Sequence, residues 1–385
     1  MKLLILIFII ILTRFALTTT PSFAIDMNVW LAWSERLYLF QPWGFYDKNI
    51  WTNYTPGYLF LLWIIGNIIH PLQINFFSPT YQIILKSFTD LFDIATSVLI
   101  FLTIQKHRGR RDATTGAFLY LANPAIIFNS SVWGQLDGLL TFFLVLAFYL
   151  LYEVKSIRYS LPIFILGFIV KPQALAEIPI FLFSLIHYPI KKILPGFVLA
   201  TLVWLFFSLL FFPKDILFGL VKLTFQMLKD YPYTSLYAFN FWALIGWWRS
   251  DLQTLLGLSL QTWGLALYTI FITIILFPLK KLDHPKPFLN YFAVSLITFA
   301  FYIFLTRIHE RYLLPFFAFF LLCAYLKRSV KFIFLYILMS FIHLYNLWYV
   351  YFSLNNSFYI FLTTISLFVF VIMLKDYYQA IYEKK

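Results

Sequence analysis

Long hydrophobic runs separated by short polar segments make up most of this 385-residue sequence. A helix needs about 20 apolar residues to cross about 30 Å of hydrocarbon, and lipid offers the backbone no other hydrogen-bond partners. The chain is 62% apolar and 12% charged, whereas soluble domains are about 45–50% apolar and about 25% charged. One soluble core cannot hide such a surplus of apolar side chains. The sequence therefore predicts an all-α polytopic membrane protein, with residues 1–385 as a single transmembrane domain.

The hydrophobic runs predict about 11 to 13 transmembrane helices. The expected crossings are residues 3–20, 81–104, 113–129, 138–152, a broken pair at 159–170 and 173–188, then 193–212, 255–277, 288–306, 312–326, 331–349 and 355–374. Residues 57–70 form a run of only about 14 residues, which is short for a full crossing. We expect this segment to be re-entrant or to lie on the membrane surface.

Basic residues cluster in short segments between these runs, and Lys and Arg in short loops favour the cytoplasm. With the amino terminus inside, the inner segments collect 18 of the 29 Lys and Arg residues. Counting 57–70 as a full crossing would put the cluster from Lys106 to Arg111 outside, which supports the re-entrant interpretation. The net charge of +13 therefore indicates topology, and no nucleic-acid partner is expected.

The amino-terminal run has two interpretations. Lys2, the apolar stretch 3–12 and the small-x-small site at 22–24 resemble a secretory signal peptide. Arg14 and the length of the run favour an uncleaved anchor, and the question of cleavage stays open. The single cysteine, Cys323, excludes an internal disulfide or thiolate metal site in one chain.

Two large outer loops are expected, at residues 21–56 and 213–254. In the first, Trp30, Trp33, Leu37 and Phe40 recur at helical intervals. This spacing predicts an amphipathic helix over residues 27–40 that lies on the membrane with its aromatic side chains at headgroup depth. Asp26 precedes that helix, where a carboxylate can cap exposed N–H groups. A cap is the ordinary interpretation of Asp26, and a functional role is the alternative.

Polar residues also follow two later runs on the expected outer face. Trp133, Gln135 and Asp137 lie in a turn that is more polar than a plain capped helix pair requires. Lys171 follows a run of about 12 residues, only about 18 Å of helix, and Pro172 breaks the helix there. A charge at that depth costs at least about 2.5 to 3.5 kcal/mol unless it faces a polar cavity. Snorkelling of Lys171 to the interface is the alternative.

A basic cluster ends the run at 288–306. Arg307, His309 and Arg311 lie beside one carboxylate, Glu310, so we expect a net positive site. Arginine suits bidentate phosphate recognition, which makes an outer-leaflet phosphate a candidate ligand. Anchoring to lipid headgroups is the alternative.

Three charged residues share one face of the run at 81–104. Lys86, Asp90 and Asp93 are spaced i, i+4 and i+7. We expect an internal ion pair among them that fixes helix packing. A proton or substrate pathway is the alternative.

In their order along residues 1–320, these motifs resemble the GT-C superfamily of integral-membrane glycosyltransferases that use polyprenyl-phosphate sugars. They are most similar to bacterial relatives of the GPI-anchor mannosyltransferases. The motifs are an acid after the first run (Asp26), Tyr-x-Pro-Gly at 54–57, an Asp-bearing run (Asp90), Asn-Pro followed by Trp-Gly-Gln-x-Asp between 123 and 137, Lys-Pro-Gln at 171–173 and His-Glu-Arg-Tyr at 309–312.

The resemblance implies a GT-C-like fold and an inverting transfer with Asp26 as general base. It implies that a hexose, with mannose as the family-level expectation, moves from a polyprenyl-phosphate sugar to a lipid-linked or envelope glycan acceptor. The reaction would take place on the non-cytoplasmic face of the cytoplasmic membrane, among membrane lipid. The candidates for binding the donor phosphate are Lys171, Arg307, His309 and Arg311. The candidates for the sugar or acceptor pocket are Asn28, Glu35, Trp133, Gln135, Asp137, Gln173 and Glu310.

Two alternatives accompany this interpretation. Relatives often carry Asp-x-Asp in the first outer loop, whereas this chain has Asp26 and Asn28, so no metal ligand is assigned; a divalent metal is allowed but not required. A transporter or flippase for a lipid-linked sugar is the alternative function, because transporters also build sites at broken helices. The crowding of polar groups on one face and the lack of inverted repeats in the sequence favour the enzyme.

Overall fold

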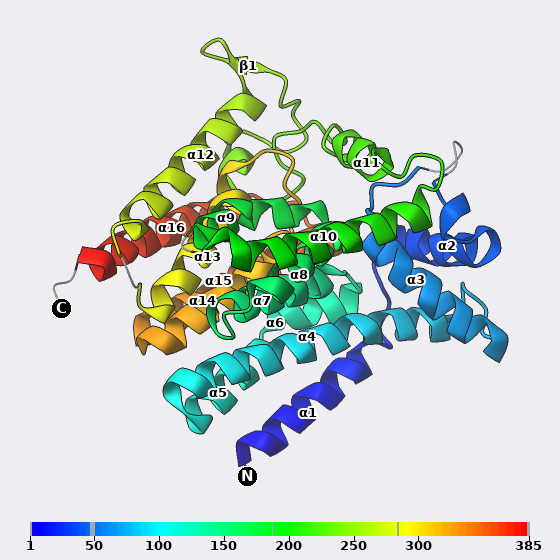
Figure 1. The fold of residues 1–385 in the computed structure, drawn as a ribbon, viewed down its shortest axis with the longest axis horizontal. Coiled ribbons are helices and arrows are strands. Elements are labelled where there is room, and N and C mark those ends of the chain that lie inside the picture. Colours follow the sequence, from blue (N-terminus) through cyan, green and yellow to red (C-terminus); the bar gives the residue numbers. More distant parts are fainter. Residues whose placement is uncertain (1, 47–50, 187, 283–284, 383–385) are drawn as a thin grey trace.

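The computed structural model describes residues 2–46, 51–186, 188–282 and 285–382, which form sixteen α-helices and one short two-stranded sheet (Figure 1). Residues 47–50 of the first expected outer loop, His187 of the run 173–188 and the basic residues Lys384 and Lys385 lie outside the described residues.

The first eight helices are α1 (Lys2–Leu17), α2 (Ala24–Phe40), α3 (Pro56–Ile69), α4 (Pro79–Arg108), α5 (Arg110–Leu121), α6 (Pro124–Ile127), α7 (Asp137–Tyr152) and α8 (Ile157–Val170). The other eight are α9 (Ile178–Leu185), α10 (Ile190–Phe211), α11 (Gly219–Met227), α12 (Leu260–Leu279), α13 (Pro287–Phe304), α14 (Leu314–Lys327), α15 (Val330–Tyr351) and α16 (Phe358–Tyr382). Short elements are the 3-10 turns η1 (Pro42–Gly44), η2 (His70–Leu72), η4 (Pro172–Glu177) and η5 (Phe241–Leu244), the π-helical turn η3 (Phe128–Trp133), and the antiparallel strands β1 (Thr254–Leu255) and β2 (Leu258–Ser259).

Six of the described helices, α4, α10, α12, α13, α15 and α16, are long and apolar enough to cross a bilayer. The chain is therefore a helical integral membrane protein, as its composition predicts. Most of the remaining expected crossings lie on shorter apolar helices of 10–17 residues, so their number stays a prediction. The run 57–70 forms the short helix α3, as its length suggested.

The segment 113–129, expected as one crossing, does not form one continuous helix. The segment divides into α5, α6 and the start of η3. Asn123 ends the continuity because its side-chain oxygen accepts hydrogen bonds from the backbone N–H groups of Ala125 and Ile126, and Pro124 has no N–H to continue the helix. The break turns the following residues toward the interior, where Ser130 and Ser131 are buried.

The expected break at Lys171 is confirmed. α8 ends at Val170, Lys171 adopts an extended backbone, and Pro172 opens the 3-10 turn η4 before α9 begins. A proline cannot continue the α8 hydrogen-bond ladder, so the chain changes direction at a charged side chain.

The aromatic face of α2 contacts protein. A helix forms as the spacing predicted, but Trp30 and Trp33 are buried, and the Trp30 ring contacts the edge of Tyr58 on α3 with 5.8 Å between centroids. The expectation that this aromatic face lies on the membrane is therefore wrong for Trp30 and Trp33, whereas Phe40 is exposed. Helical spacing identifies a shared apolar face but leaves open whether protein or lipid covers it.

Helix α13 lies near the centre of the assembly (Figure 1). In the most apolar 18 residues of α13, 78% are buried inside the protein, whereas the corresponding stretch of α10 has 22% buried. Because α13 is surrounded by other helices, the segment that follows it, from Leu305 to Leu313, begins inside the protein.

The loop 213–254 holds that segment in place through backbone hydrogen bonds. The N–H of Leu236 donates to the carbonyl of Ile308, and the N–H of Arg307 donates to the carbonyl of Tyr233. Arg307 has a positive φ of 63°, which turns the chain sharply after α13. The loop thus fixes the backbone immediately before His309.

Asp90 and Asp93 on α4 pair with Arg14 of α1. The Arg14 guanidinium lies 2.8 Å from Asp90 and also pairs with Asp93, and all three side chains are fully buried. Lys86 instead donates to the carbonyl of Thr20 over 2.6 Å. The expected ion pair within α4 is corrected accordingly, because the cation comes from a neighbouring helix.

Candidate functional site

Three segments that leave helix ends bring opposite charges together. The Lys171 ammonium, just after α8, lies 2.6 Å from the Asp137 carboxylate at the start of α7. Arg311, just before α14, has its Nε 3.9 Å from the other oxygen of Asp137. Arg311 also donates to Glu310 over 2.6 Å. Asp137 therefore lies between two cations from different parts of the chain.

Asp26 accepts two side-chain hydrogen bonds from the turn before α7. Trp133 Nε1 donates to Asp26 Oδ2 over 2.9 Å, and Gln135 Nε2 donates to the same oxygen over 2.5 Å. Asp26 lies in the first turn of α2, whose N-cap, Phe23, makes no side-chain cap. Asp26 therefore does not cap α2, because it lies inside the first turn of the helix. Asp26 Oδ1 accepts no hydrogen bond from the described residues.

Tyr54 connects Asp26 with the charged network. Burial raises the pKa of the Tyr54 hydroxyl well above its ordinary value; the charge of Arg311 opposes this rise, and the charges of Asp26 and Asp137 add to it. These four side chains are close enough to influence one another electrostatically. The polar turn at 133–137 and the cluster at 307–312 thus lie on the same side of the protein.

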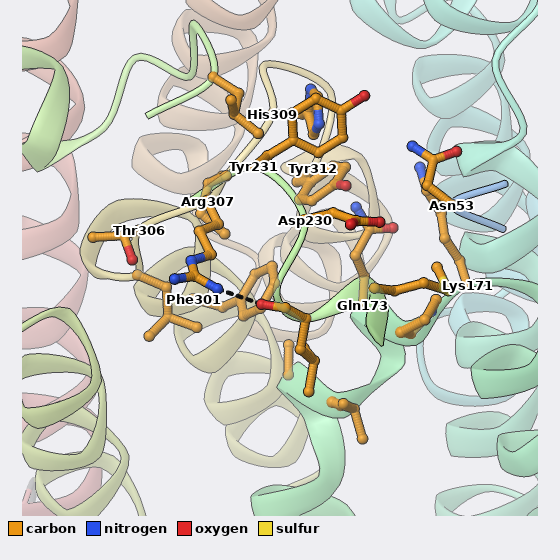
Figure 2. Close-up of a pocket in the computed structure, with 18 of the residues that line it drawn as sticks. Asn53, Lys171, Gln173, Asp230, Tyr231, Phe301, Thr306, Arg307, His309 and Tyr312 are labelled. Carbon is orange, nitrogen blue, oxygen red and sulfur yellow. Dashed lines mark hydrogen bonds between the residues drawn. The ribbon is translucent and has the colours of Figure 1, made fainter. Parts of the chain in front are cut away.

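A cavity of about 460 Å³ adjoins this network. Lys171 and Asn53 lie at one side of it, and Thr306 and Arg307 lie at the other (Figure 2). Gln173, Asp230, Tyr231, His309, Arg311 and Tyr312 also line the cavity, whereas Asp26, Asp137 and Glu310 do not. The remaining wall is largely apolar, with Leu175, Leu265, Phe301 and Leu305. The cavity therefore combines charged side chains on two sides with a largely apolar remaining wall.

Arg307 is held by a carboxylate that the motifs did not indicate. Its Nε lies 2.7 Å from Asp251, and its NH1 donates to the carbonyl of Leu228. Thr306 also donates to Asp251 over 2.9 Å. Asp251 pairs with Arg307 and Glu310 pairs with Arg311. The expectation of a net positive cluster is therefore wrong, because each arginine has a carboxylate partner.

His309 and Glu310 have opposite ionisation behaviour. Burial, and next the charge of Arg311, lower the pKa of the His309 imidazole below its ordinary value of 6.5. Burial alone would raise the pKa of Glu310, but Arg311 and next the His309 imidazole, whose Nδ1 lies 3.7 Å from Oε2, outweigh it and lower this pKa to about 2. At neutral pH the pair is a neutral imidazole beside an ionised carboxylate.

Several buried polar atoms near the cavity have no hydrogen-bond partner among the described residues. They are Gln135 Oε1, Asp137 Oδ2, Arg311 Nε and both polar atoms of Gln173. A buried polar atom without a partner costs roughly 1–3 kcal/mol. Such a concentration of unmatched donors and acceptors is typical of a site that binds a polar ligand.

Two predicted pocket residues stand apart from this network. Asn28 is exposed on α2, and Glu35 is half-buried one helical turn before the end of that helix. Neither lines the cavity or makes an ion pair with the described residues. The structure brings together the other ten predicted site residues through the network, the cavity or both.

Other residues that line the cavity lie outside the predicted set. Asp230 and Tyr231 line the cavity from the loop after α11, and Tyr231 lies edge-on to His309 with 5.6 Å between ring centroids. Asn53 lines the cavity beside Lys171. Burial raises the pKa of Asp230. The only signal in the sequence was an acid beside aromatic residues in an outer loop, which no periodic pattern distinguishes.

The described residues contain no group of three or more His, Cys, Asp or Glu side chains that could hold a metal ion. Neither the models of known protein families nor the curated proteins match this chain. The described fold and site thus define a helical integral membrane protein that encloses a charged, partly apolar cavity.

Proposed function

We propose that the protein is an inverting glycosyltransferase that moves a hexose from a polyprenyl-phosphate sugar to a glycan acceptor. The proposed setting is the non-cytoplasmic face of the cytoplasmic membrane, in a GT-C-like fold. The observation that carries the proposal is the meeting of Asp26, Lys171 and Arg311, from three distant segments, around Tyr54 and Asp137.

Asp26 is suited to act as a general base. Two donors hold its Oδ2, so the orientation of the carboxylate is fixed, while Oδ1 is free to accept a proton. In the proposed reaction the acceptor hydroxyl attacks the anomeric carbon and its proton moves to Asp26. The bond between that carbon and the phosphate oxygen breaks, and the polyprenyl phosphate leaves with the electron pair.

Lys171 and Arg311 are suited to stabilise the leaving phosphate. Both line the cavity, and each retains N–H groups beyond those that bind Asp137 and Glu310. Fixed cations in a water-poor site lower the energy of developing negative charge because they need no reorganisation during the reaction. The apolar part of the cavity wall offers a surface for the first units of a prenyl chain.

The cavity volume supports a ligand of this size. About 460 Å³ falls within the range of roughly 300–1,000 Å³ for small-molecule sites. The Lys171 ammonium also lies 4.9 Å from the ring centre of Tyr312, an arrangement that orients the cation at the cavity wall.

The test is turnover by purified protein given polyprenyl-phosphate hexoses and a lipid-linked glycan acceptor. Asp26→Asn should lower kcat at least about 100-fold because a positioned general base contributes about 10²–10⁴-fold. Asp112→Asn, at the first turn of α5, is the matched control and should retain turnover. Unchanged turnover in Asp26→Asn would remove Asp26 from the mechanism. Movement of the lipid-linked sugar across vesicles without product would favour the transporter.

A further inference from the structure

A second cavity lies at the other end of the helices. It encloses about 420 Å³ between the ends of α4, α7, α9, α12 and α13, and none of its lining residues lines the first cavity. The turn from α4 to α5 lies at this end, opposite α2 and α3 (Figure 1). The proposed transferase chemistry makes no use of this cavity.

Two lysines give the second cavity an excess of positive charge. Lys106 and Lys155 line it together with one carboxylate, Glu153. Glu153 is already held: Lys106 Nζ lies 3.0 Å from Oε2, His107 Nε2 lies 2.8 Å from the same oxygen, and Tyr291 donates to Oε1 over 3.2 Å. Lys155 is exposed and makes no ion pair with the described residues. The described charges on the wall therefore favour an anion.

Neutral polar groups stand beside these cations. Tyr152 and Ser184 share a hydrogen bond of 2.8 Å, and Asn290 lines the same cavity. Hydroxyl and amide groups next to lysines can donate to phosphate oxygens. The wall therefore offers both cations and neutral hydrogen-bond donors to the oxygens of a phosphate group.

The surface next to the cavity is apolar and exposed. On α9, Ser184 lines the cavity, while Leu182 and Ile186 on either side of it have exposed fractions of 55% and 75%. Phe277 near the end of α12 is also exposed. In a membrane protein such side chains face acyl chains, so a headgroup in the cavity would have its tails beside them.

From these features we propose that the second cavity binds the phosphate headgroup of an anionic phospholipid. The phosphate lies between Lys106 and Lys155, and the acyl chains follow the exposed face of α9. Basic pockets between transmembrane helices are the usual place for such headgroups on the cytoplasmic side, which is where the pattern of basic residues predicts this end to lie.

Native mass spectrometry of the purified full-length protein tests the proposal, with phosphatidylglycerol and phosphatidylcholine as probes. Wild-type protein should retain phosphatidylglycerol preferentially. Lys155→Ala alone, and Lys106→Ala with Lys155→Ala, should weaken that binding, the double variant by about tenfold or more. Lys191→Ala with Lys192→Ala removes the same charge from the start of α10, outside the cavity lining, and should leave the binding nearly unchanged.

Three outcomes would overturn the site. Equal losses in the two double variants would assign the lipid to general surface charge, and equal retention of phosphatidylcholine would show that the headgroup charge is not recognised. Displacement of the lipid by an equal concentration of inorganic phosphate would give the cavity to a soluble anion. Because Lys155 is exposed, Lys155→Ala should keep the thermal midpoint of wild type, which separates a binding loss from misfolding.

Discussion

The Lys171 ammonium donates to the Asp137 carboxylate over 2.6 Å, with both side chains almost completely buried. Lys171 follows the end of α8 and Asp137 begins α7, so the contact fixes where one helix stops relative to the start of another. Buried charges are costly without a partner. The pair therefore couples the position of the helix break to the shape of the candidate site.

Replacing one member of this pair should destabilise the protein strongly. Lys171→Met or Asp137→Asn leaves a buried group without its partner, and each should lower the free energy of unfolding by about 3–5 kcal/mol. The double variant should lose less than the sum of the two single variants, because no charge is left unmatched. Denaturant unfolding in detergent measures all three, and strictly additive losses would mean that the two side chains act independently.

The sequence predicts most of the helices but not what covers them. Apolar runs located α4, α10, α13, α15 and α16 because length and hydropathy alone define such helices. The helix break within 113–129 is hard to predict because both halves of the run are apolar and only one Asn-Pro step marks it. Likewise, spacing placed Trp30 on an apolar face without showing that α3 covers it.

The site residues that could be predicted are those whose burial costs free energy. Lys171 is one of them, because a charged side chain beside a proline in an apolar run is costly to bury unless it has a polar partner or cavity. Asp251 and Asp230 could not be predicted as site residues, because an acidic side chain in a polar loop has no desolvation cost that would mark it in the sequence. Only the folded loop brings Asp251 to Arg307 and Asp230 to the cavity. Arg14 interrupts an apolar run of the sequence, but its partners lie 76 and 79 residues away, beyond any periodic pattern.

The pairing of Arg14 with two carboxylates predicts a large loss of stability on its removal. Arg14→Leu leaves Asp90 and Asp93 buried without a cation and should lower the free energy of unfolding by about 3–5 kcal/mol. Combining it with Asp90→Asn and Asp93→Asn should restore part of that loss. Thr13→Ala, at an exposed neighbour, is the matched control for both.

Thermal midpoints followed by size-exclusion chromatography measure these Arg14 variants. The intact mass of each purified variant should be measured first, because only protein that contains α1 carries the substituted residue. A wild-type midpoint for Arg14→Leu would contradict the structural role of the cluster.

Gly57 should be irreplaceable because α3 meets α8 there. A Cβ at Gly57 would lie 2.7 Å from the backbone nitrogen of Val170 and 2.8 Å from the carbonyl of Ile169, immediately before Lys171. Gly57→Ala should cost about 1–3 kcal/mol of unfolding free energy and lower turnover in the proposed transferase reaction by shifting Lys171. Gly167→Ala, whose Cβ would meet Phe143 at an ordinary 3.4 Å, should be tolerated. Equal stability and turnover in the two variants would refute this packing constraint.

Mildly acidic pH should lower the free energy of unfolding because of His309. Its pKa in the folded protein is lowered from 6.5 by burial and by Arg311, so below that value the unfolded chain takes up a proton that the folded protein does not. The free energy of unfolding should therefore fall as pH falls from about 7 to about 5. Glu310, with a pKa lowered to about 2 from 4.5, adds stability that is complete above pH 4.5 and is lost only toward pH 2. Its contribution is therefore constant between about pH 7 and about pH 5.

Thermal midpoints across this pH range should show a smaller slope for His309→Asn than for wild type, and a uniform decrease for Glu310→Gln. Identical slopes for His309→Asn and wild type would assign the pH dependence to another group.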